Sequence, residues 1–151
     1  MIAKYLSESI AIKTVDVGAD NVIAEILKKY PWADTKEVRG RIMSYPPNVK
    51  KLKMVLGKDW LAVGGILTPM EDSYLAMFSI FSYRSAANKW CDEGVGMNHI
   101  NYHGKNGLSR LTKLFNSYMK MFSVCRSSEE ALKIMHHRFF QGKDDDFHFY
   151  R

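Results

Sequence analysis

The sequence predicts a mixed α/β (α+β) fold in one domain over residues 1–151, with helices flanking a largely antiparallel sheet. Three observations predict it. The length is that of a single domain. The content of 46% hydrophobic and 25% charged residues is ordinary for a soluble globular protein. Segments with strand periodicity and segments with helix periodicity follow one another along the chain.

The N-terminal part is expected to form a strand and two helices. Residues 10–17 alternate apolar and polar side chains, which is typical of a strand. Asp20 is a suitable N-cap for a helix over residues 21–30, and Pro31 ends that helix. A second short helix is expected over residues 34–45, capped by its first or second residue and followed by two prolines.

Three strands are expected next, and then an irregular segment. Residues 48–69 predict a hairpin whose glycine-containing turn lies at residues 57–59. Residues 73–83 are rich in aromatic and β-prone side chains and predict a third strand. Glycines are frequent afterwards, so we expect an irregular insertion at about residues 84–103, in which part of residues 84–92 is a candidate helix.

The C-terminal part is expected to hold two helices and two short strands. Residues 108–121 predict a long amphipathic helix, because apolar side chains recur along one side. Residues 121–125 are a candidate short strand. Residues 127–139 predict another helix, capped by one of the two serines at its start and favoured by two glutamates in its first turn. Residues 147–151 are expected to form a final strand.

The bulk composition indicates the kind of partner and compartment. The formal net charge of +6 favours an anionic partner, such as nucleic acid, a nucleotide cofactor or an anionic surface. Cys91 and Cys125 are expected to be reduced thiols, with a single disulfide as the alternative. Residues 1–13 are too polar for a signal peptide, and no apolar run approaches the roughly 18 residues of a membrane helix. We therefore expect a cytoplasmic protein without a membrane partner.

The stretch directly before the helix at residues 108–121 is a candidate anion site. A helix N-terminus leaves N–H groups unpaired and carries partial positive charge, and glycines let backbone amides approach a phosphate. Lys105 and Arg110 add positive charge. The candidate residues are Gly104, Lys105, Asn106, Gly107, Leu108, Ser109 and Arg110. The alternative interpretation is that the glycines only allow the chain to turn before the helix.

The order of elements resembles the fold of the GNAT family of N-acetyltransferases, in which a strand, a glycine-containing loop and a helix follow one another. The family's loop reads Arg or Gln, two residues, Gly, one residue, then Gly or Ala, and its amides hold the pyrophosphate of acyl-CoA. Here Gly104 stands at the Arg or Gln position, Gly107 at the central glycine and Ser109 at the last small residue. Residues 91–96 also match the two small positions of this loop, with Gly94 and Gly96 there and Cys91 at the Arg or Gln position. The resemblance implies an acyl-CoA cofactor, such as acetyl-CoA, and an amine acceptor.

The C-terminal helix extends this resemblance. In the family it carries an Asn, an Ala and a Tyr, and the Tyr commonly protonates the departing thiolate. Here Ser128 stands at the Asn position, Ala131 matches, and Met135 stands at the Tyr position. His136, next to it, is the candidate substitute. The family connects its strand and loop directly, whereas residues 84–103 separate the two here.

The resemblance also implies where the substrates would lie. Glu71 and Asp72 precede the third strand of the group, from where a carboxylate or its bound water could take a proton from the amine. The alternative is that these two residues belong to a polar turn. The strand that contains Phe78 and Ile80 would pair through its backbone with the pantetheine arm.

A second hypothesis is a non-enzymatic basic protein, of viral or mobile-element type, that binds nucleic acid or a host protein. The lysines and arginines form an early and a late group along the sequence. Four aromatic residues interleaved with them could stack on bases: Tyr45, Trp60, Tyr83 and Trp90. No recognition helix, RNP motif or zinc finger is present in the sequence.

No metal site is expected from the histidines. His99 and His103 have the spacing of a helical metal pair but fall in the segment expected to be irregular. His136 and His137 are adjacent, so on a helix their side chains point in different directions.

Overall fold

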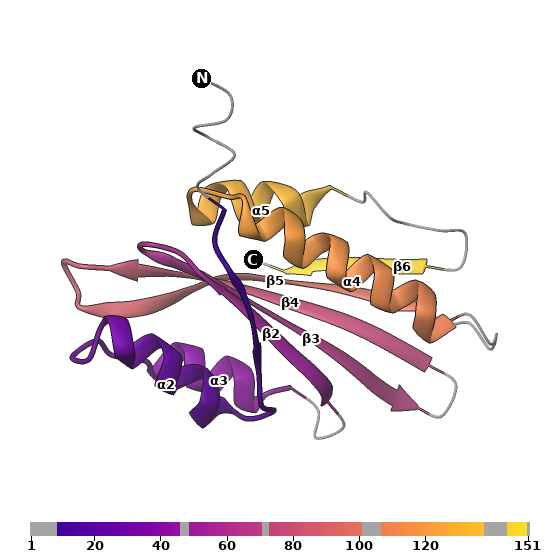
Figure 1. Cartoon of the computed structure of the whole chain (residues 1–151), viewed down its shortest axis with the longest axis horizontal. Coiled ribbons are helices and arrows are strands. Elements are labelled where there is room, and N and C mark those ends of the chain that lie inside the picture. Colours follow the sequence, from indigo (N-terminus) through magenta and orange to yellow (C-terminus); the bar gives the residue numbers. More distant parts are fainter. Residues whose placement is uncertain (1–8, 46–48, 71–72, 101–106, 138–144, 151) are drawn as a thin grey trace.

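The computed structural model describes residues 9–45, 49–70, 73–100, 107–137 and 145–150, which form one sheet and four helices (Figure 1). The strands are β1 (Ile12–Val15), β2 (Val49–Leu56), β3 (Trp60–Met70), β4 (Ser73–Arg84), β5 (Lys89–Ile100) and β6 (Asp145–Tyr150). The helices are α2 (Ala19–Lys29), α3 (Lys36–Met43), α4 (Gly107–Ser123) and α5 (Ser128–His136).

The described strands make a six-stranded sheet whose spatial order equals their order along the chain. Each strand pairs antiparallel with the next, so the predicted largely antiparallel sheet is confirmed. The predicted hairpin turn at residues 57–59 is also confirmed, and the Gly57 N–H donates to the Trp60 carbonyl at 2.8 Å. This order places β1 at one edge of the sheet and β6 at the other.

Helices cover both faces of the sheet, so the mixed α+β class is confirmed. In Figure 1, α2 and α3 lie on one face and α4 and α5 on the other. The first pair packs over a core that includes Val38 and Leu61, and the second pair packs over a core that includes Phe78 and Phe115. Successive side chains of a strand point to opposite faces, so the central strands supply both cores.

The irregular insertion expected at residues 84–103 is wrong, because β5 occupies most of it. β5 pairs with β4 along its whole length, and residues 85–88 form the turn between them. Asn88 closes that turn with φ of +50°, and its Oδ1 accepts a hydrogen bond from Tyr83 Oη at 2.7 Å. The helix considered within residues 84–92 therefore does not form.

A β-bulge explains why β5 does not look like a strand in the sequence. Ile80 pairs with Gly94 and Phe81 pairs with Asp92, so Glu93 is an extra residue on β5. Gly94 has φ of +159°, a backbone conformation that other residues rarely adopt. The glycine that suggested a loop is therefore the residue that allows the strand to bend.

The helix boundaries agree with the sequence in part. The strand expected at residues 121–125 is wrong, because α4 continues to Ser123 and Phe122 extends its buried side. α5 begins as predicted, with the Ser127 hydroxyl accepting from the Glu130 N–H at 3.2 Å. Asp20 is not the cap of α2, which begins at Ala19.

Candidate functional site

α4 begins at the stretch predicted to bind an anion. β5 ends at Ile100 and α4 begins at Gly107, so only residues 101–106 connect the two elements. Three of the predicted loop residues, Gly104, Lys105 and Asn106, lie outside the described residues. Strand, short connection and helix therefore follow directly at this end of the sheet (Figure 1).

The other four predicted loop residues form the first turn of α4. Gly107 is buried, whereas Leu108 and Ser109 are exposed. Arg110 is half-buried and already interacts with another group. Ser109 therefore faces solvent at a helix N-terminus, where partial positive charge favours an anion.

Phe78 and Ile80 lie on an interior strand rather than at an open edge. Phe78 pairs with Gly64 of β3 on one side and with Gly96 of β5 on the other. Both side chains are buried on the α4 face, where the Phe78 ring centroid lies 5.6 Å from that of Phe115. Backbone pairing of this strand with a pantetheine arm would require one of its neighbours to be displaced.

Of the predicted acid–base residues, the structure describes only His136. Glu71 and Asp72 lie outside the described residues. His136 is exposed in the last turn of α5, and the carbonyl of the following His137 accepts from Tyr118 Oη at 2.8 Å. Tyr118 lies about three helical turns from the start of α4. The structure therefore places His136 near the middle of α4.

Asn98 is a buried polar residue that sequence reasoning missed. Its side chain is on the α4 face near the end of β5, since it pairs with the core residue Ala76. The residue is 2% exposed, and Oδ1 has no hydrogen-bond partner within the described part of the chain. Leaving a buried acceptor unpaired costs about 1–3 kcal/mol, so this oxygen is a candidate for contact with a water or a ligand.

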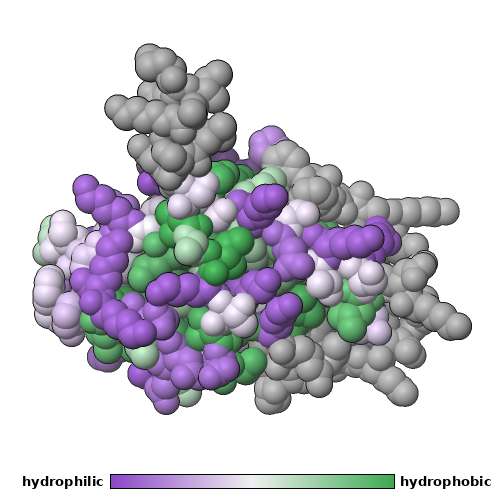
Figure 2. Space-filling view, in the orientation of Figure 1, coloured by the Kyte–Doolittle hydropathy of each residue, from purple (hydrophilic) through white to green (hydrophobic). Residues whose placement is uncertain are grey.

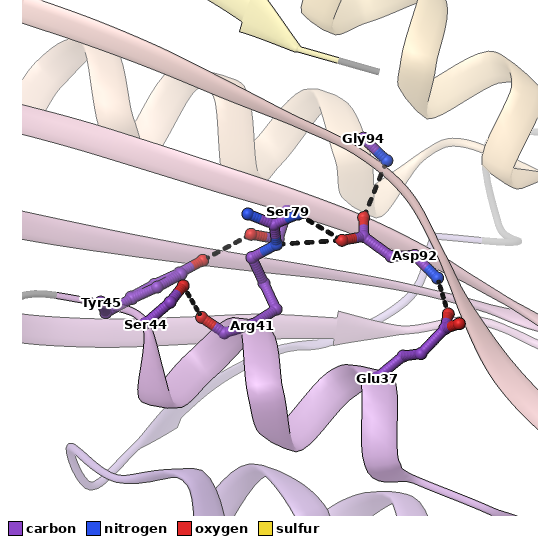
Figure 3. Close-up of polar contacts among 7 residues, drawn as sticks. All are labelled: Glu37, Arg41, Ser44, Tyr45, Ser79, Asp92 and Gly94. Carbon is purple, nitrogen blue, oxygen red and sulfur yellow. Dashed lines mark hydrogen bonds and ion pairs between the residues drawn. The ribbon is translucent and has the colours of Figure 1, made fainter.

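A second polar cluster joins α3 to β5 on the opposite face (Figure 3). Arg41 donates from Nε at 3.0 Å, and also from Nη2, to Oδ2 of Asp92. The other oxygen, Oδ1, accepts the Gly94 N–H at 3.1 Å, and the Asp92 N–H donates to Glu37 Oε2 at 2.7 Å. Beside them, the buried hydroxyls of Tyr45 and Ser79 are hydrogen-bonded at 2.8 Å. Burial raises the pKa of Tyr45 above its ordinary value, so its hydroxyl stays protonated.

This cluster supplies hydrogen-bond partners to the part of β5 that does not pair with β6. β6 pairs with β5 only from Val95 to Ile100. Before Val95, hydrogen bonds from β5 go to α3 and to the segment that precedes it. The Trp90 N–H donates to the Asp34 carbonyl at 2.9 Å, and the Asp92 N–H donates to the Glu37 carboxylate. Unpaired strand edges are unfavourable, so the carboxylates here have a structural role.

Two cavities adjoin the cluster. One of about 430 Å³ is lined by Arg41 and Asp92 together with Met77, Val95 and Met97. The other, of about 400 Å³, lies along α3 at the same two charged residues. Every charged side chain among the linings is already paired within the cluster or with neighbours. These cavities therefore present a neutralised surface rather than a strongly charged one.

A third cavity lies between β1, β2 and α4 on the α4 face. Its volume is about 450 Å³, and its lining includes Lys53 of β2 and Lys120 of α4. Lys53 Nζ donates to Asn116 Oδ1 at 3.2 Å. Burial, and then the neighbouring charge of Lys51, lower the pKa of Lys53. The cavity thus brings together lysines from the early and late basic groups of the sequence.

Three of the four aromatic residues expected to stack on bases belong to the protein's interior instead, and Tyr83 is half-buried. Trp60 and Trp90 are at most 1% exposed, and Tyr45 is buried. Tyr83 stacks on Tyr30, with ring centroids 4.6 Å apart. A stacking surface made of these four side chains is therefore wrong.

The described cysteine thiols and carboxylates form no further reactive centre. Cys91 and Cys125 are both free and buried. Within the described ranges, no group of three or more His, Cys, Asp or Glu side chains is arranged to hold a metal ion. None of the described helices has both the length and the apolar character needed to cross a membrane.

Comparisons with known proteins give no match. No protein-family model, no curated protein and no solved structure matches this chain.

Proposed function

We propose that this chain binds acyl-CoA at the start of α4, as a GNAT-like N-acyltransferase or a relative of that fold that retains the cofactor site. One observation carries the proposal. β5 ends only six residues before α4, so a strand, a short glycine-containing connection and a helix follow directly. In the sequence, residues 84–103 separate the third predicted strand from the helix, unlike in the family. In the structure, β5 occupies most of these residues.

The first turn of α4 supports the proposal chemically. A helix of 17 residues ends there with backbone N–H groups that lack helical partners, and its partial positive charge suits a pyrophosphate. Exposed Ser109 gives such a group access to the turn. The buried oxygen of Asn98, which has no hydrogen-bond partner among the described residues, lies on the same side of the sheet near the end of β5.

The reaction itself would be attack of an amine nitrogen on the thioester carbonyl. The carbon–sulfur bond breaks, the acyl group passes to nitrogen, and the proton lost by the amine ends on the CoA sulfur. Glu71 or Asp72 would take the amine proton, and His136 is the candidate donor to the thiolate; these roles come from the family resemblance.

The element order after α4 differs from that of the family. α4 leads directly into α5, without the intervening strand expected at residues 121–125. For this reason the test is cofactor binding rather than turnover, since a protein that has lost activity can keep its cofactor site.

The test compares Ser109→Glu with the neutral, similarly shaped Ser109→Gln. A carboxylate at this exposed position repels the pyrophosphate but favours the helix, by about 0.3–1 kcal/mol at a helix N-terminus. We expect acetyl-CoA to raise the melting temperature of the wild type and of Ser109→Gln, and Ser109→Glu to bind about tenfold more weakly by calorimetry. No thermal shift, with wild-type binding weaker than about 1 mM, would contradict the proposal.

The alternative of a basic protein that binds nucleic acid predicts a different result. A gel shift would then show steep salt dependence and no effect of acetyl-CoA. Three of the four expected stacking residues, Tyr45, Trp60 and Trp90, are buried, which argues against this alternative.

A further inference from the structure

The cavity between β1, β2 and α4, here called the β1–α4 groove, has features that the proposed cofactor site does not use. Its lining residues are Ser9, Ile10, Ile12, Lys53, Asn116, Met119, Lys120, Ser123 and Val124. On α4 these residues begin at Asn116, two to three helical turns beyond Gly107. The groove is therefore a separate site at the opposite end of the helix.

Close packing of α4 on the middle of the sheet accounts for the groove. A Cβ added to Gly64 of β3 would lie 2.7 Å from Met119 Sδ and 2.8 Å from Phe115 Cε2, so the helix approaches the backbone there. β1, at the sheet edge, lies beyond this contact. The Ile10 N–H donates to the Ser123 carbonyl at 2.7 Å, which ties the chain before β1 to the end of α4. The groove is thus held by contacts within the fold rather than by a single loop.

The apolar part of the groove is unusually open to solvent. Ile12 is 38% exposed and Val124 is 56% exposed, although both are large hydrophobic residues. Half-buried Ile10 and buried Met119 complete the apolar lining. Figure 2 shows hydrophobic residues between hydrophilic side chains on the face that Figure 1 presents. Such a surface gains free energy when an apolar group covers it.

The polar part of the groove carries positive charge only. Lys53 and Lys120 line it, and no carboxylate is among the described lining residues. Lys53 is half-buried and donates to Asn116, so its ammonium is oriented. A groove with an apolar wall and two ammonium groups is complementary to a ligand with an apolar part and one negative end.

We propose that the β1–α4 groove binds an amphipathic monocarboxylate, an unbranched apolar chain that ends in one carboxylate. The chain lies against Ile10, Ile12 and Val124, and the carboxylate points toward Lys53 and Lys120. The cavity of about 450 Å³ lies in the usual range of small-molecule sites. No aromatic residue is among the lining residues that the structure describes, which disfavours a nucleic acid.

The probe for this proposal is decanoate, titrated into the full chain by calorimetry. We expect saturable binding with Kd on the order of 10–100 μM, given the usual efficiency of small ligands. Acetate, which lacks the apolar chain, and decyltrimethylammonium, which carries the opposite charge, are expected to bind at least about tenfold more weakly, because each lacks one half of the complementarity.

Two matched pairs of variants locate the site. Val124→Glu adds a negative charge at an exposed position of the groove, and Val124→Gln is its neutral control. Lys120→Met removes one ammonium, and Lys133→Met removes an exposed lysine of α5 outside the groove. We expect about tenfold weaker decanoate binding for Val124→Glu and about fivefold for Lys120→Met, with Val124→Gln and Lys133→Met close to wild type.

Several outcomes would overturn the proposal. They are no saturable binding of decanoate below about 1 mM, equal binding of decyltrimethylammonium, or unchanged binding in both Val124→Glu and Lys120→Met. A dimer in sedimentation that Val124→Glu dissociates, without decanoate binding, would show that a second copy covers the groove instead. Acetyl-CoA binding is measured on the same variants and is expected to be unchanged, so failure here is distinct from failure of the proposed function.

Discussion

At the scale of single residues, the structure gives partners to charged side chains that look like ordinary surface residues in the sequence. Arg41 and Asp92 are separated by 51 positions, yet the guanidinium makes two hydrogen bonds to one carboxylate oxygen. Their side chains are 29% and 25% exposed, which makes the pair half-buried. No local pattern signals a pair this distant, so only a fold can reveal it.

Replacing Arg41 should therefore destabilise the protein more than replacing Arg39 on the same helix. In Arg41→Met, Asp92 keeps its bond from Gly94 but loses both guanidinium bonds, and we expect a loss of about 1–3 kcal/mol in the free energy of unfolding. Arg39→Met on the same helix breaks an exposed pair with Asp20 and should cost about 0–1 kcal/mol. Urea unfolding measures both. Equal effects would contradict a structural role of the Arg41 pair.

The thiol of Cys125 gives a residue-scale prediction for pH. Burial, and then the charge of Glu130, raise the pKa of Cys125 to about 12, so the folded state holds the thiol proton more tightly than the unfolded state does. The associated stabilisation is present below the ordinary thiol pKa and is lost as the pH rises through it toward the folded value.

In a Cys91→Ser background, Cys125 is the only thiol in the chain. We expect a thiol reagent to modify it slowly in the native state at pH 8 and rapidly in urea, and we expect the free energy of unfolding to fall between pH 8 and pH 11. Native modification as fast as in urea would show that the thiol is not held in the core.

At the scale of elements, the sequence predicts the helices and strands whose local hydrophobic pattern matches the packing they have in the fold. α4 has a long apolar side that buries Leu111, Phe115 and Phe122, and its existence and start follow from that pattern. The hairpin of β2 and β3 follows from two apolar runs joined at a glycine-containing turn. The fold class is predictable because it follows from the order of such elements.

β5 and the end of α4 could not be predicted, for physical reasons that lie outside their own segments. Gly94 serves a bulge against β4, and that role exists only once the two strands pair. Residues 121–125 have a strand-like composition, but Phe122 packs in the α4 core, and residues 121–123 belong to the helix. The Lys53–Asn116 contact likewise joins residues 63 positions apart, so the β1–α4 groove has no signal in the sequence.

Glycines in two elements give opposite predictions for the same substitution. At Gly64 of β3, an added Cβ would meet Met119 and Phe115 below 3.0 Å, so Gly64→Ala should destabilise the protein by about 1–3 kcal/mol through overpacking. At Gly40 of α3, nothing lies within 4 Å of the added atom, so Gly40→Ala should stabilise the helix by about 0.5–1 kcal/mol. Thermal unfolding of the two variants measures the difference, and a destabilising Gly40→Ala or a neutral Gly64→Ala would contradict the packing described.

At the scale of the whole molecule, the sheet separates two environments. The face under α2 and α3 holds the neutralised Arg41–Asp92 cluster, and the face under α4 and α5 holds the start of α4 and the β1–α4 groove (Figure 1). Two of the lysines that contribute to the net charge of +6 line one open groove. The two proposed sites lie at opposite ends of one helix and should bind their ligands independently.

The most direct test of the account is a titration of the ¹⁵N-labelled protein with acetyl-CoA, followed by two-dimensional NMR. We predict that the largest amide shift changes fall on the first turn of α4, from Gly107 to Arg110, and that the amides from Asn116 to Ser123 change little. Saturation without changes at the first turn, or no changes at millimolar acetyl-CoA, would contradict the claim that the start of α4 binds the cofactor.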